Sequence, residues 1–181
     1  MARRRNRFVD FLKTLMLLVF LAGASGVLAF FSRESVQAQA RVLDGDSLVL
    51  AGREIRLLGV DAPEYNQTCV NKNWGTEFSC GKQARSHLAK LVNGKTVVCN
   101  GWEHDRHDRL LAQCKAGETD LNRRMVRDGW AVSFGDYGSE EEIAKRQGAG
   151  LWSSSFETPS QWRENNREAH RSSVFGWMLA W

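Results

Sequence analysis

The sequence predicts an α+β protein, in which an N-terminal hydrophobic helix is followed by a small five-stranded antiparallel β-barrel with three helices. From Val36 onward, short runs of alternating apolar and polar residues are separated by turns, as is typical of antiparallel strands. From Gly81 the apolar period becomes helical, then returns to the strand pattern, and ends with two further helical stretches. Strands and helices grouped in this order indicate an α+β domain and not alternating βα units.

Three strands open the domain as a meander. Glycine-containing turns at Asp44-Gly45-Asp46 and Ala51-Gly52 separate them, and Pro63 ends the third because proline cannot donate to a ladder. The strands are expected over Val36 to Leu43, Ser47 to Leu50 and Glu54 to Val60.

The middle of the chain predicts a loop, a helix and two strands. Glu64 to Ser79 has no clean period and is expected to be a loop. Gly81 to Val92 has an apolar face at helical spacing, and Asn93-Gly94 stops that helix. Two apolar strands then follow, one containing Cys99 and the other Cys114.

Two more helices complete the domain. Thr119 or Asp120 can cap a helix whose apolar positions fall within Leu121 to Val126. Ser139 with Glu142 three residues later forms a capping-box pattern that would open the third helix. Five short strands with these helices make an OB-type barrel the natural candidate.

The N-terminus predicts export. Arginines precede an uncharged, largely apolar run from Thr14 to Phe31, which is just long enough to span a bilayer as a helix. Basic residues on its front edge place the rest of the chain outside the cytoplasm, in the periplasm or secreted. Two interpretations stay open: a cleaved signal peptide, for which Val27-Leu28-Ala29 is an acceptable cleavage pattern, or an uncleaved anchor in the inner membrane.

These patterns divide the chain into four parts. We expect a signal peptide or signal anchor over residues 1–31, a linker over 32–35, the folded domain over 36–163 and a C-terminal tail over 164–181. The tail turns apolar at its end, so it could pack on the domain, fray or contact a membrane surface. The only expected membrane contact otherwise is through an uncleaved N-terminal segment, and we expect a monomer.

The four cysteines agree with export, since an even count in an exported chain suggests two bridges. If the strands that contain Cys99 and Cys114 form a hairpin, the two cysteines fall opposite each other, which suits a disulfide. Cys69 and Cys80 would then close a short polar loop. Four buried free thiols are the alternative; a zinc site is disfavoured, because no Cys-x-x-Cys pair exists.

The net charge of +4 does not by itself indicate a nucleic-acid-binding surface. Of the 25 basic and 21 acidic residues, five basic residues and one acid fall within the first 31, which leaves the remainder balanced. Any affinity for a polyanion must therefore come from a local cluster and not from a generally basic domain.

The stretch from Leu43 to Glu64 is the candidate active site, because acids and arginines are interleaved there with the strands. Asp46 and Asp61 lie at the end of a turn and the end of a strand, positions that can converge at one mouth of a barrel. Two carboxylates with a backbone carbonyl and waters would suit Ca²⁺. Glu64, just beyond Pro63, could act as general base on a water.

Two arginines extend this set. Each arginine could also have no functional role: Arg56 could form a surface ion pair with Glu54, and Arg109 could be a solvated turn residue. In combination with a cation and a carboxylate base, however, two guanidinium groups are what in-line attack of water on a phosphodiester needs. The base activates the water, while the cation and arginines stabilise charge on phosphorus.

Four motifs follow one another along the chain: Asp44-Gly45-Asp46, Ile55 to Glu64, Asp105 to Ala112, and Asp120 to Ala131. With these motifs, the sequence from about Val36 to Arg163 resembles the thermonuclease family, that is, the staphylococcal-nuclease-like proteins. The resemblance implies an OB barrel with three helices and Ca²⁺-dependent hydrolysis of DNA and RNA to 3′-phosphate products.

The resemblance also implies roles for individual residues. Asp46 and Asp61 match calcium carboxylates, and Ala62 matches the residue that offers its backbone carbonyl. Glu64 matches the general base, and Arg56 and Arg109 match phosphate-binding arginines.

The chain departs from the family pattern near the second arginine. His107-Asp108 stands where the family usually has Tyr-Gly, so we expect an altered turn and a possible competition of Asp108 with phosphate for Arg109. Arg106 and His107 flank the site and could help to bind phosphate. Phe134 and Tyr137 are candidates by position for stacking on a base.

The leading hypothesis is an exported, calcium-dependent nuclease. The alternative is a non-catalytic or accessory secreted OB-fold protein, for example one linked to exopolysaccharide (succinoglycan) production, as some bacterial relatives are. A calcium-binding structural module would bind metal without turnover. All five predicted site residues are retained, which favours the nuclease.

Overall fold

The computed structural model describes residues 9–21 and 34–167. Residues 9–21 form a helix, which is a unit separate from the domain that follows. The predicted apolar run from Thr14 to Phe31 continues past this helix, and residues 22–31, with the cleavage pattern, lie outside the described residues. Across 9–21 and 34–167, no helix is both long enough and apolar enough to cross a membrane.

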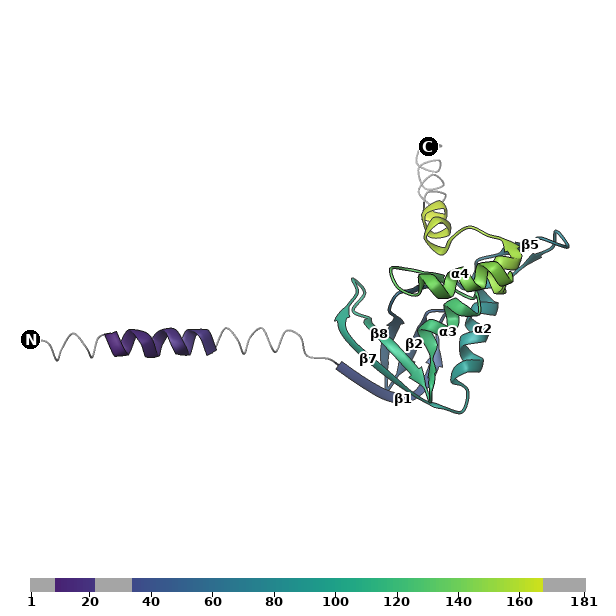
Figure 1. The fold of residues 1–181 in the computed structure, drawn as a ribbon. Helices are drawn as coiled ribbons and strands as arrows, with labels where there is room; N and C mark the ends of the chain where they lie inside the picture. The colour runs from purple at the N-terminus through teal and green to yellow at the C-terminus, as the bar shows by residue number, and fades with distance from the viewer. Residues whose placement is uncertain (1–8, 22–33, 168–181) are drawn as a thin grey trace, which may run out of the picture. The chain divides into compact units, whose positions relative to one another are not determined.

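The domain is built on a closed ring of five strands (Figure 1). Neighbours around the ring are β1–β2, β2–β3, β3–β8, β8–β7 and β7–β1. The strands are β1 (Glu34–Val42), β2 (Ser47–Leu50), β3 (Arg53–Leu57), β7 (Thr96–His104) and β8 (Leu110–Ala116). The predicted OB-type α+β barrel is thus the observed architecture.

The predicted antiparallel arrangement is wrong at one pair, because β3 and β8 run parallel. They align Ile55 with Leu110 and Leu57 with Ala112. The reason is geometrical: strands that alternate in direction around a ring of five cannot all be antiparallel to both neighbours, so one pair must be parallel. That pair joins segments far apart in sequence, which a local pattern does not report.

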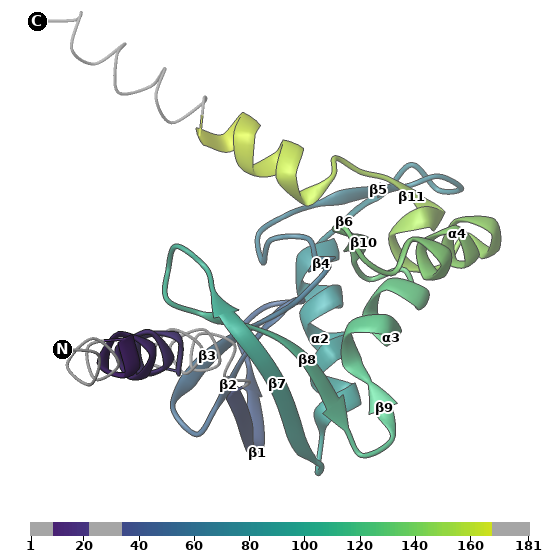
Figure 2. The ribbon, with the colours of Figure 1, turned by 60° about the vertical axis from the view of Figure 1, so that its left-hand side comes forward.

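The hydrophobic core lies inside this ring and between the ring and two helices, α2 (Cys80–Val92) and α3 (Leu121–Arg127). Both helices lie beside the barrel (Figure 2). Both helices were predicted, and Asp120 caps α3 by accepting a hydrogen bond from the Arg123 N–H at 3.0 Å. Burying a leucine side chain contributes about 1.5–3 kcal/mol. The largest fully buried apolar side chains are Leu48, Leu50, Ile55, Leu57, Leu88, Leu110, Leu121, Met125 and Leu151.

Two disulfides form, as the cysteine positions predicted. Cys99 lies opposite Cys114 in the β7–β8 register, with 4.1 Å between their Cα atoms. Cys69 bonds to Cys80 and so closes the segment that leads into α2. Bridges of this kind are typical of proteins that leave the reducing cytosol, and they indicate an extracellular or periplasmic protein.

Short strands replace parts of the predicted strand and loop pattern. The third predicted strand is split, because Gly59 takes a left-handed conformation (φ 73°) between β3 and β4 (Val60–Asp61). The predicted loop from Glu64 to Ser79 contains β5 (Cys69–Asn71) and β6 (Glu77–Phe78). β5 and β6 pair with each other, whereas other partners are distant in sequence: β4 pairs with β10 (Val132–Ser133), and β5 also pairs with β11 (Ser154–Ser155). β9 (Thr119–Asp120) folds back to pair antiparallel with the end of β8 and leads into α3.

The third predicted helix is α4 (Gly138–Gln147), but its predicted capping box does not form. The N-cap residue is Tyr137 in a left-handed conformation, and the Ser139 hydroxyl donates to the Glu140 carboxylate at 2.7 Å. A short 3₁₀ helix, η1 (Gly150–Ser153), follows α4. A further, unpredicted helix begins at Pro159 and continues to the last described residue, 167.

Candidate active site

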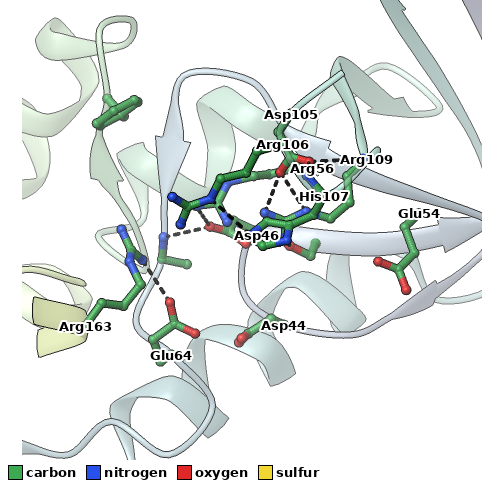
Figure 3. A pocket seen from close by; sticks show the side chains of 13 residues that line it. Asp44, Asp46, Glu54, Arg56, Glu64, Asp105, Arg106, His107, Arg109 and Arg163 are labelled. Carbon is green, nitrogen blue, oxygen red and sulfur yellow. Dashed lines mark hydrogen bonds and ion pairs between the residues drawn. The ribbon is translucent and has the colours of Figure 1, made fainter. Parts of the chain in front are cut away.

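The sequence-predicted residues gather around one pocket at the mouth of the barrel, with a volume of about 750 Å³ (Figure 3). It lies between the β1–β2 turn, the segment after β4, and the β7–β8 turn. The predicted residues that line it are Asp46, Arg56, Ala62, Glu64, Arg106, His107, Arg109 and Phe134. The predicted Asp61 is not a lining residue, but its carboxylate contacts Arg56 at 2.9 Å. The other lining residues are Asp44, Ser47, Glu54, Asp105 and Arg163.

Asp46 and Asp61 converge on one guanidinium group. Arg56 Nη2 lies 2.7 Å from Asp46 Oδ2 and 2.9 Å from Asp61 Oδ1, and both acids are buried. Burial raises the pKa of Asp46, while the nearby charge of Arg56 acts in the opposite direction. Arg56 is therefore no surface partner of Glu54: it neutralises the two acids predicted to bind a cation.

Register and backbone packing hold this cluster in place. Arg56 on β3 lies opposite Ser47 on β2, and the Ser47 hydroxyl donates to Asp46 Oδ1 at 2.7 Å. Gly45 lets the turn approach the next segment, because a Cβ there would lie 2.7 Å from the Cβ of Ala62. The Ala62 N–H in turn points at Asp46 Oδ2 at 3.4 Å.

Glu64 is positioned by the start of α2. A Cβ on Gly81 would lie 1.8 Å from the carbonyl oxygen of Glu64, so this approach requires glycine. The Gln67 side chain accepts from the Glu64 N–H at 3.3 Å. Gln67 is fully buried and also donates to the Glu157 carbonyl at 2.7 Å, which ties the Glu64 segment to the chain that leads into the C-terminal helix. Sequence reasoning did not identify Gln67.

Arg163 is the main residue of the site that the sequence patterns missed. Its Nη1 lies 2.8 Å from Glu64 Oε1 and 3.0 Å from Asp61 Oδ1, and its Nη2 lies 3.0 Å from Asp61 Oδ2 (Figure 3 labels Arg163 and Glu64). Partial burial disfavours the charged guanidinium, but hydrogen bonds to Asp61 and Glu64 outweigh it and raise the pKa of Arg163. The site therefore contains a fourth arginine, in addition to Arg56, Arg106 and Arg109.

A sequence signal for this helix does exist. Proline is favoured at the first helical position, and threonine is a common N-cap. Thr158 precedes Pro159, and its hydroxyl accepts from the Gln161 N–H at 3.3 Å. A Thr-Pro start places Arg163 in the second turn, although nothing in the local pattern shows that this turn faces Asp61.

Arg109 is held by Asp105 and not by Asp108. Asp105 Oδ2 accepts from Arg109 Nε at 2.8 Å and lies 2.6 Å from Nη2, and Asp105 Oδ1 accepts from the backbone N–H of Arg109 at 3.0 Å. Burial opposes ionisation, but these hydrogen bonds lower the pKa of Asp105 to about 2. The expected competition of Asp108 is not what the geometry shows: Asp108 adopts the left-handed conformation (φ 62°) that closes the turn.

The rim contains the remaining candidates. Arg106 Nε donates to His107 Nε2 at 3.2 Å, and both side chains are exposed. Phe134 lines the pocket with 71% of its surface exposed, which leaves a ring face open for stacking. Tyr137 instead packs against the barrel core and does not line the pocket.

Asp44 is one of five carboxyl residues that line the pocket, with Asp46, Glu54, Glu64 and Asp105. Burial raises its pKa to about 6, helped by the charges of Asp46 and Glu64, while a hydrogen bond from the Gly45 N–H acts in the opposite direction. The pocket thus joins several acids to several arginines.

The donor chemistry of the predicted cation site fits Ca²⁺, since two aspartates and a backbone carbonyl offer only oxygen ligands. Within the described residues, no three His, Cys, Asp or Glu side chains gather as a metal centre. A cation here would rely on Asp46, Asp61 and the Ala62 carbonyl, and it would meet the guanidinium groups of Arg56 and Arg163 on those carboxylates.

The closed five-stranded barrel and its pocket of acids and arginines define an OB-type domain with a candidate hydrolytic site. The sequence model of the family described as "Staphylococcal nuclease homologue" matches residues 54–154. The chain belongs to this staphylococcal nuclease family.

Relatives with several names support this membership. The chain is 36% identical over 126 residues to a succinoglycan biosynthesis protein, ExoI, of Rhizobium meliloti, an alignment that covers 66% of this chain and 65% of that protein. It is 34% identical over 130 residues to an uncharacterized endonuclease of Escherichia coli O157:H7, covering 66% of this chain and 78% of the relative.

A plant relative is longer. The chain is 30% identical over 141 residues to a probable staphylococcal-like nuclease, CAN4, of Oryza sativa subsp. japonica. That alignment covers 74% of this chain and 26% of the plant protein. The chain thus spans between about a quarter and about four fifths of these three relatives.

Proposed function

We propose that this protein is a calcium-dependent phosphodiesterase that hydrolyses DNA and RNA to 3′-phosphate products. The observation that carries the proposal is the placement of Glu64, Arg56 and Arg109 around one pocket with Asp46 and Asp61. Membership of the staphylococcal nuclease family supports the same reaction class, as does the word endonuclease or nuclease in the names of several relatives.

In the proposed reaction, Glu64 takes a proton from a water molecule as that water attacks phosphorus. The new bond joins the water oxygen to phosphorus, and the bond from phosphorus to the 5′ oxygen breaks. The 5′ oxygen takes up a proton from solvent water, and Glu64 afterwards releases its proton to solvent. A general base of this kind contributes about 10²–10⁴ in rate. Arg56 and Arg109 bind the phosphate oxygens, on which negative charge increases in the transition state.

A calcium ion on Asp46, Asp61 and the Ala62 carbonyl would supply further positive charge beside the phosphate. Asp105 holds Arg109 in a fixed orientation through its side chain and its backbone, so the guanidinium keeps one direction while the phosphate binds. Arg106 and His107 stand at the rim, where they could contact a neighbouring phosphate, and Phe134 offers a ring to a base.

The proposal includes export. The two disulfides support a protein that folds outside the cytosol, and the apolar N-terminal run with its arginines supports a signal peptide or an anchor. We propose the domain over residues 36–163 as the catalytic unit, acting as a monomer. The helix that contains Arg163 continues into the first residues of the predicted tail, as far as residue 167.

The experiment that tests the proposal follows one labelled single-stranded oligonucleotide. The full chain is incubated with the 5′-labelled DNA in calcium or in a chelator, and the product ends are then treated with a phosphatase that removes 3′-phosphates. Cleavage in calcium alone, with products whose mobility shifts after phosphatase, is expected. Cleavage that is equal in chelator, or products that end in 3′-hydroxyl, would refute the calcium-dependent, 3′-phosphate mechanism.

The second candidate is a non-catalytic or accessory secreted protein linked to exopolysaccharide production. The name of the Rhizobium meliloti relative favours it, at 36% identity. Retention of Glu64 and both arginines in the pocket favours catalysis over a purely binding role. A protein that binds DNA or calcium without turnover in the assay above would support the accessory alternative.

A further inference from the structure

Helix α2 begins against the active site and contains no acidic residue. From Cys80 to Val92 its charged residues are Lys82, Arg85 and Lys90, although the chain after residue 31 has equal numbers of basic and acidic residues. Its first turn packs on the Glu64 carbonyl through Gly81. A local basic element therefore starts where the proposed general base stands.

One side of α2 joins these cations to an aromatic ring. Tyr65, the residue after Glu64, is 44% exposed. Lys82 Nζ lies 5.6 Å and Arg85 Cζ 5.8 Å from the centre of its ring. A cation over the face of a tyrosine is attracted by the ring and holds it in place. The ring and both cations thus form one exposed group beside the pocket.

The same side of the helix continues into a second cleft. This cleft, with a volume of about 340 Å³, lies between β1 and α2 and is lined by Arg41, Arg85 and Lys95. No acidic side chain is among the described residues that line it. Arg85 joins the two regions: it reaches the Tyr65 ring and also donates to the backbone carbonyls of Leu43 and Val42 at 3.0 and 3.2 Å.

The opposite side of α2 is occupied differently. His87 lies 2.7 Å from Asp128 next to α3, so that side packs on the domain. Lys82, Arg85 and Lys95 are exposed, as is Arg41. Of the acidic pocket residues, Asp44 reaches this end of the surface, where it accepts a hydrogen bond from the Tyr65 backbone.

We propose that Arg41, Lys82, Arg85 and Lys95, with Tyr65, form an α2 basic surface that binds the backbone of a single-stranded nucleic acid leading away from the active site. This rests on the proposed nuclease function and adds where the rest of the strand lies. Phosphate affinity comes from clustered cations, and an exposed ring offers a stacking surface for a base of any sequence.

The dimensions fit a strand longer than the scissile step. The 13 residues of α2 span about 20 Å at 1.5 Å per residue. That length accommodates several nucleotides, within the roughly 4–16 nucleotides that OB folds bind. The surface therefore selects for polymers and is irrelevant to a dinucleotide, which fills only the pocket.

The test measures binding and cleavage separately. Fluorescence anisotropy in a chelator follows binding of a labelled single-stranded DNA of about 20 nucleotides, with the full chain and with Lys82→Glu/Lys95→Glu. A chelator prevents cleavage, so the binding result does not depend on the proposed reaction. Cleavage in calcium is then followed with the same DNA and with a dinucleotide.

A matched control changes the same charge elsewhere. Lys115→Glu/Arg146→Glu reverses two exposed cations on β8 and α4 that line neither cleft. Thermal unfolding of each variant checks that the fold is kept, and Lys82→Gln/Lys95→Gln gives a milder version that removes charge without adding acid.

If the α2 basic surface binds the strand, Lys82→Glu/Lys95→Glu weakens binding of the long DNA roughly tenfold at 0.15 M salt. The negative slope of log K against log salt becomes less steep by about 1.4, or 0.7 per lost phosphate contact. Cleavage of the dinucleotide stays unchanged, and the control variant binds like the wild type. Equal losses in both double variants, or no loss in either, overturn the proposal. An inactive wild type that shows the same binding difference refutes the nuclease function alone.

Discussion

Arg163 binds both carboxylate oxygens of Asp61, although the two residues are 102 positions apart in the sequence. Two nearly parallel contacts of 3.0 Å form a bidentate pair, the strongest geometry for an arginine and a carboxylate. The same guanidinium reaches Glu64 at 2.8 Å. One side chain from the C-terminal helix therefore forms hydrogen bonds with both a predicted cation ligand, Asp61, and the predicted general base, Glu64.

This contact predicts that Arg163 competes with calcium. Arg163→Ala removes the bidentate guanidinium from Asp61 and leaves only Arg56 on its Oδ1. Calcium binding should therefore tighten about fivefold, the equivalent of an ion pair worth about 1 kcal/mol on a partly exposed side chain. Titration calorimetry of the full chain measures the affinity directly. Arg167→Ala, one turn later in the same helix, is the control and should bind calcium like the wild type; weaker binding in Arg163→Ala contradicts the competition.

Asp105 should matter for both catalysis and acid stability. Asp105→Asn removes the charged partner of Arg109, so phosphate binding loses orientation, and kcat/KM should fall roughly tenfold, about 1.4 kcal/mol. Because the folded-state pKa of Asp105 is lowered to about 2, its stabilising effect is present above its unfolded pKa near 3.8 and is lost as pH falls toward 2.

Urea unfolding of wild type and Asp105→Asn at a series of pH values checks this. The difference in unfolding free energy should be full at pH 5 and above and shrink through the range below about 4. A difference that stays constant down to pH 2 would show that Asp105 acts through packing and not through its charge.

Gly81→Ala should displace Glu64. The new Cβ would meet the Glu64 carbonyl oxygen at 1.8 Å, and neither backbone can yield without moving the other. We expect a stability loss of about 1–3 kcal/mol together with loss of cleavage. Gly138→Ala at the start of α4 is the control, since a Cβ there meets no atom within 4 Å. Unfolding midpoints and activity that match in the two variants would argue against this role for Gly81.

The Cys99–Cys114 bridge should support the barrel and leave the chemistry intact. It closes a loop of 15 residues between β7 and β8, for which removal costs about 3 kcal/mol. Replacing both cysteines with alanine should lower the free energy of unfolding, measured by denaturant titration, by that amount, while cleavage under native conditions persists. Loss of cleavage in a variant that is still folded would mean that the bridge also positions the β7–β8 turn and Arg109.

Local sequence patterns predicted most of the barrel, because strand alternation and helix period are set by which face each residue turns to the core. Asp120 as the α3 cap and the two disulfides follow from the same kind of local reasoning. The parallel β3–β8 pair and the β4–β10 and β5–β11 pairs could not be read this way. They join distant segments, and short strands of two or three residues have no measurable period.

The residues of the candidate site also fall into two groups, those that local sequence predicts and those that only the tertiary structure shows. Asp46, Arg56, Asp61 and Glu64 stand close together in sequence with the spacing that chemistry needs, so they could be named in advance. Arg163 reaches the site only through tertiary contacts. Gln67 lies near Glu64 in the sequence and accepts from its N–H, but the hydrogen bond that anchors it goes to the distant Glu157 carbonyl. Asp105 was overlooked because its neighbour Asp108 has the same charge, and only the turn geometry decides which one meets Arg109.

The central claim is that Glu64 activates water in this pocket, and the most direct test is one measurement on one variant. Initial rates of single-stranded DNA cleavage in calcium are compared for the wild type and Glu64→Gln, which keeps the size of the side chain but cannot accept the proton. We predict cleavage by the wild type and a loss of about 10²–10⁴ in kcat for the variant, with unchanged thermal stability in calcium. A variant that cuts as fast as the wild type, or a wild type that does not cut, contradicts the account.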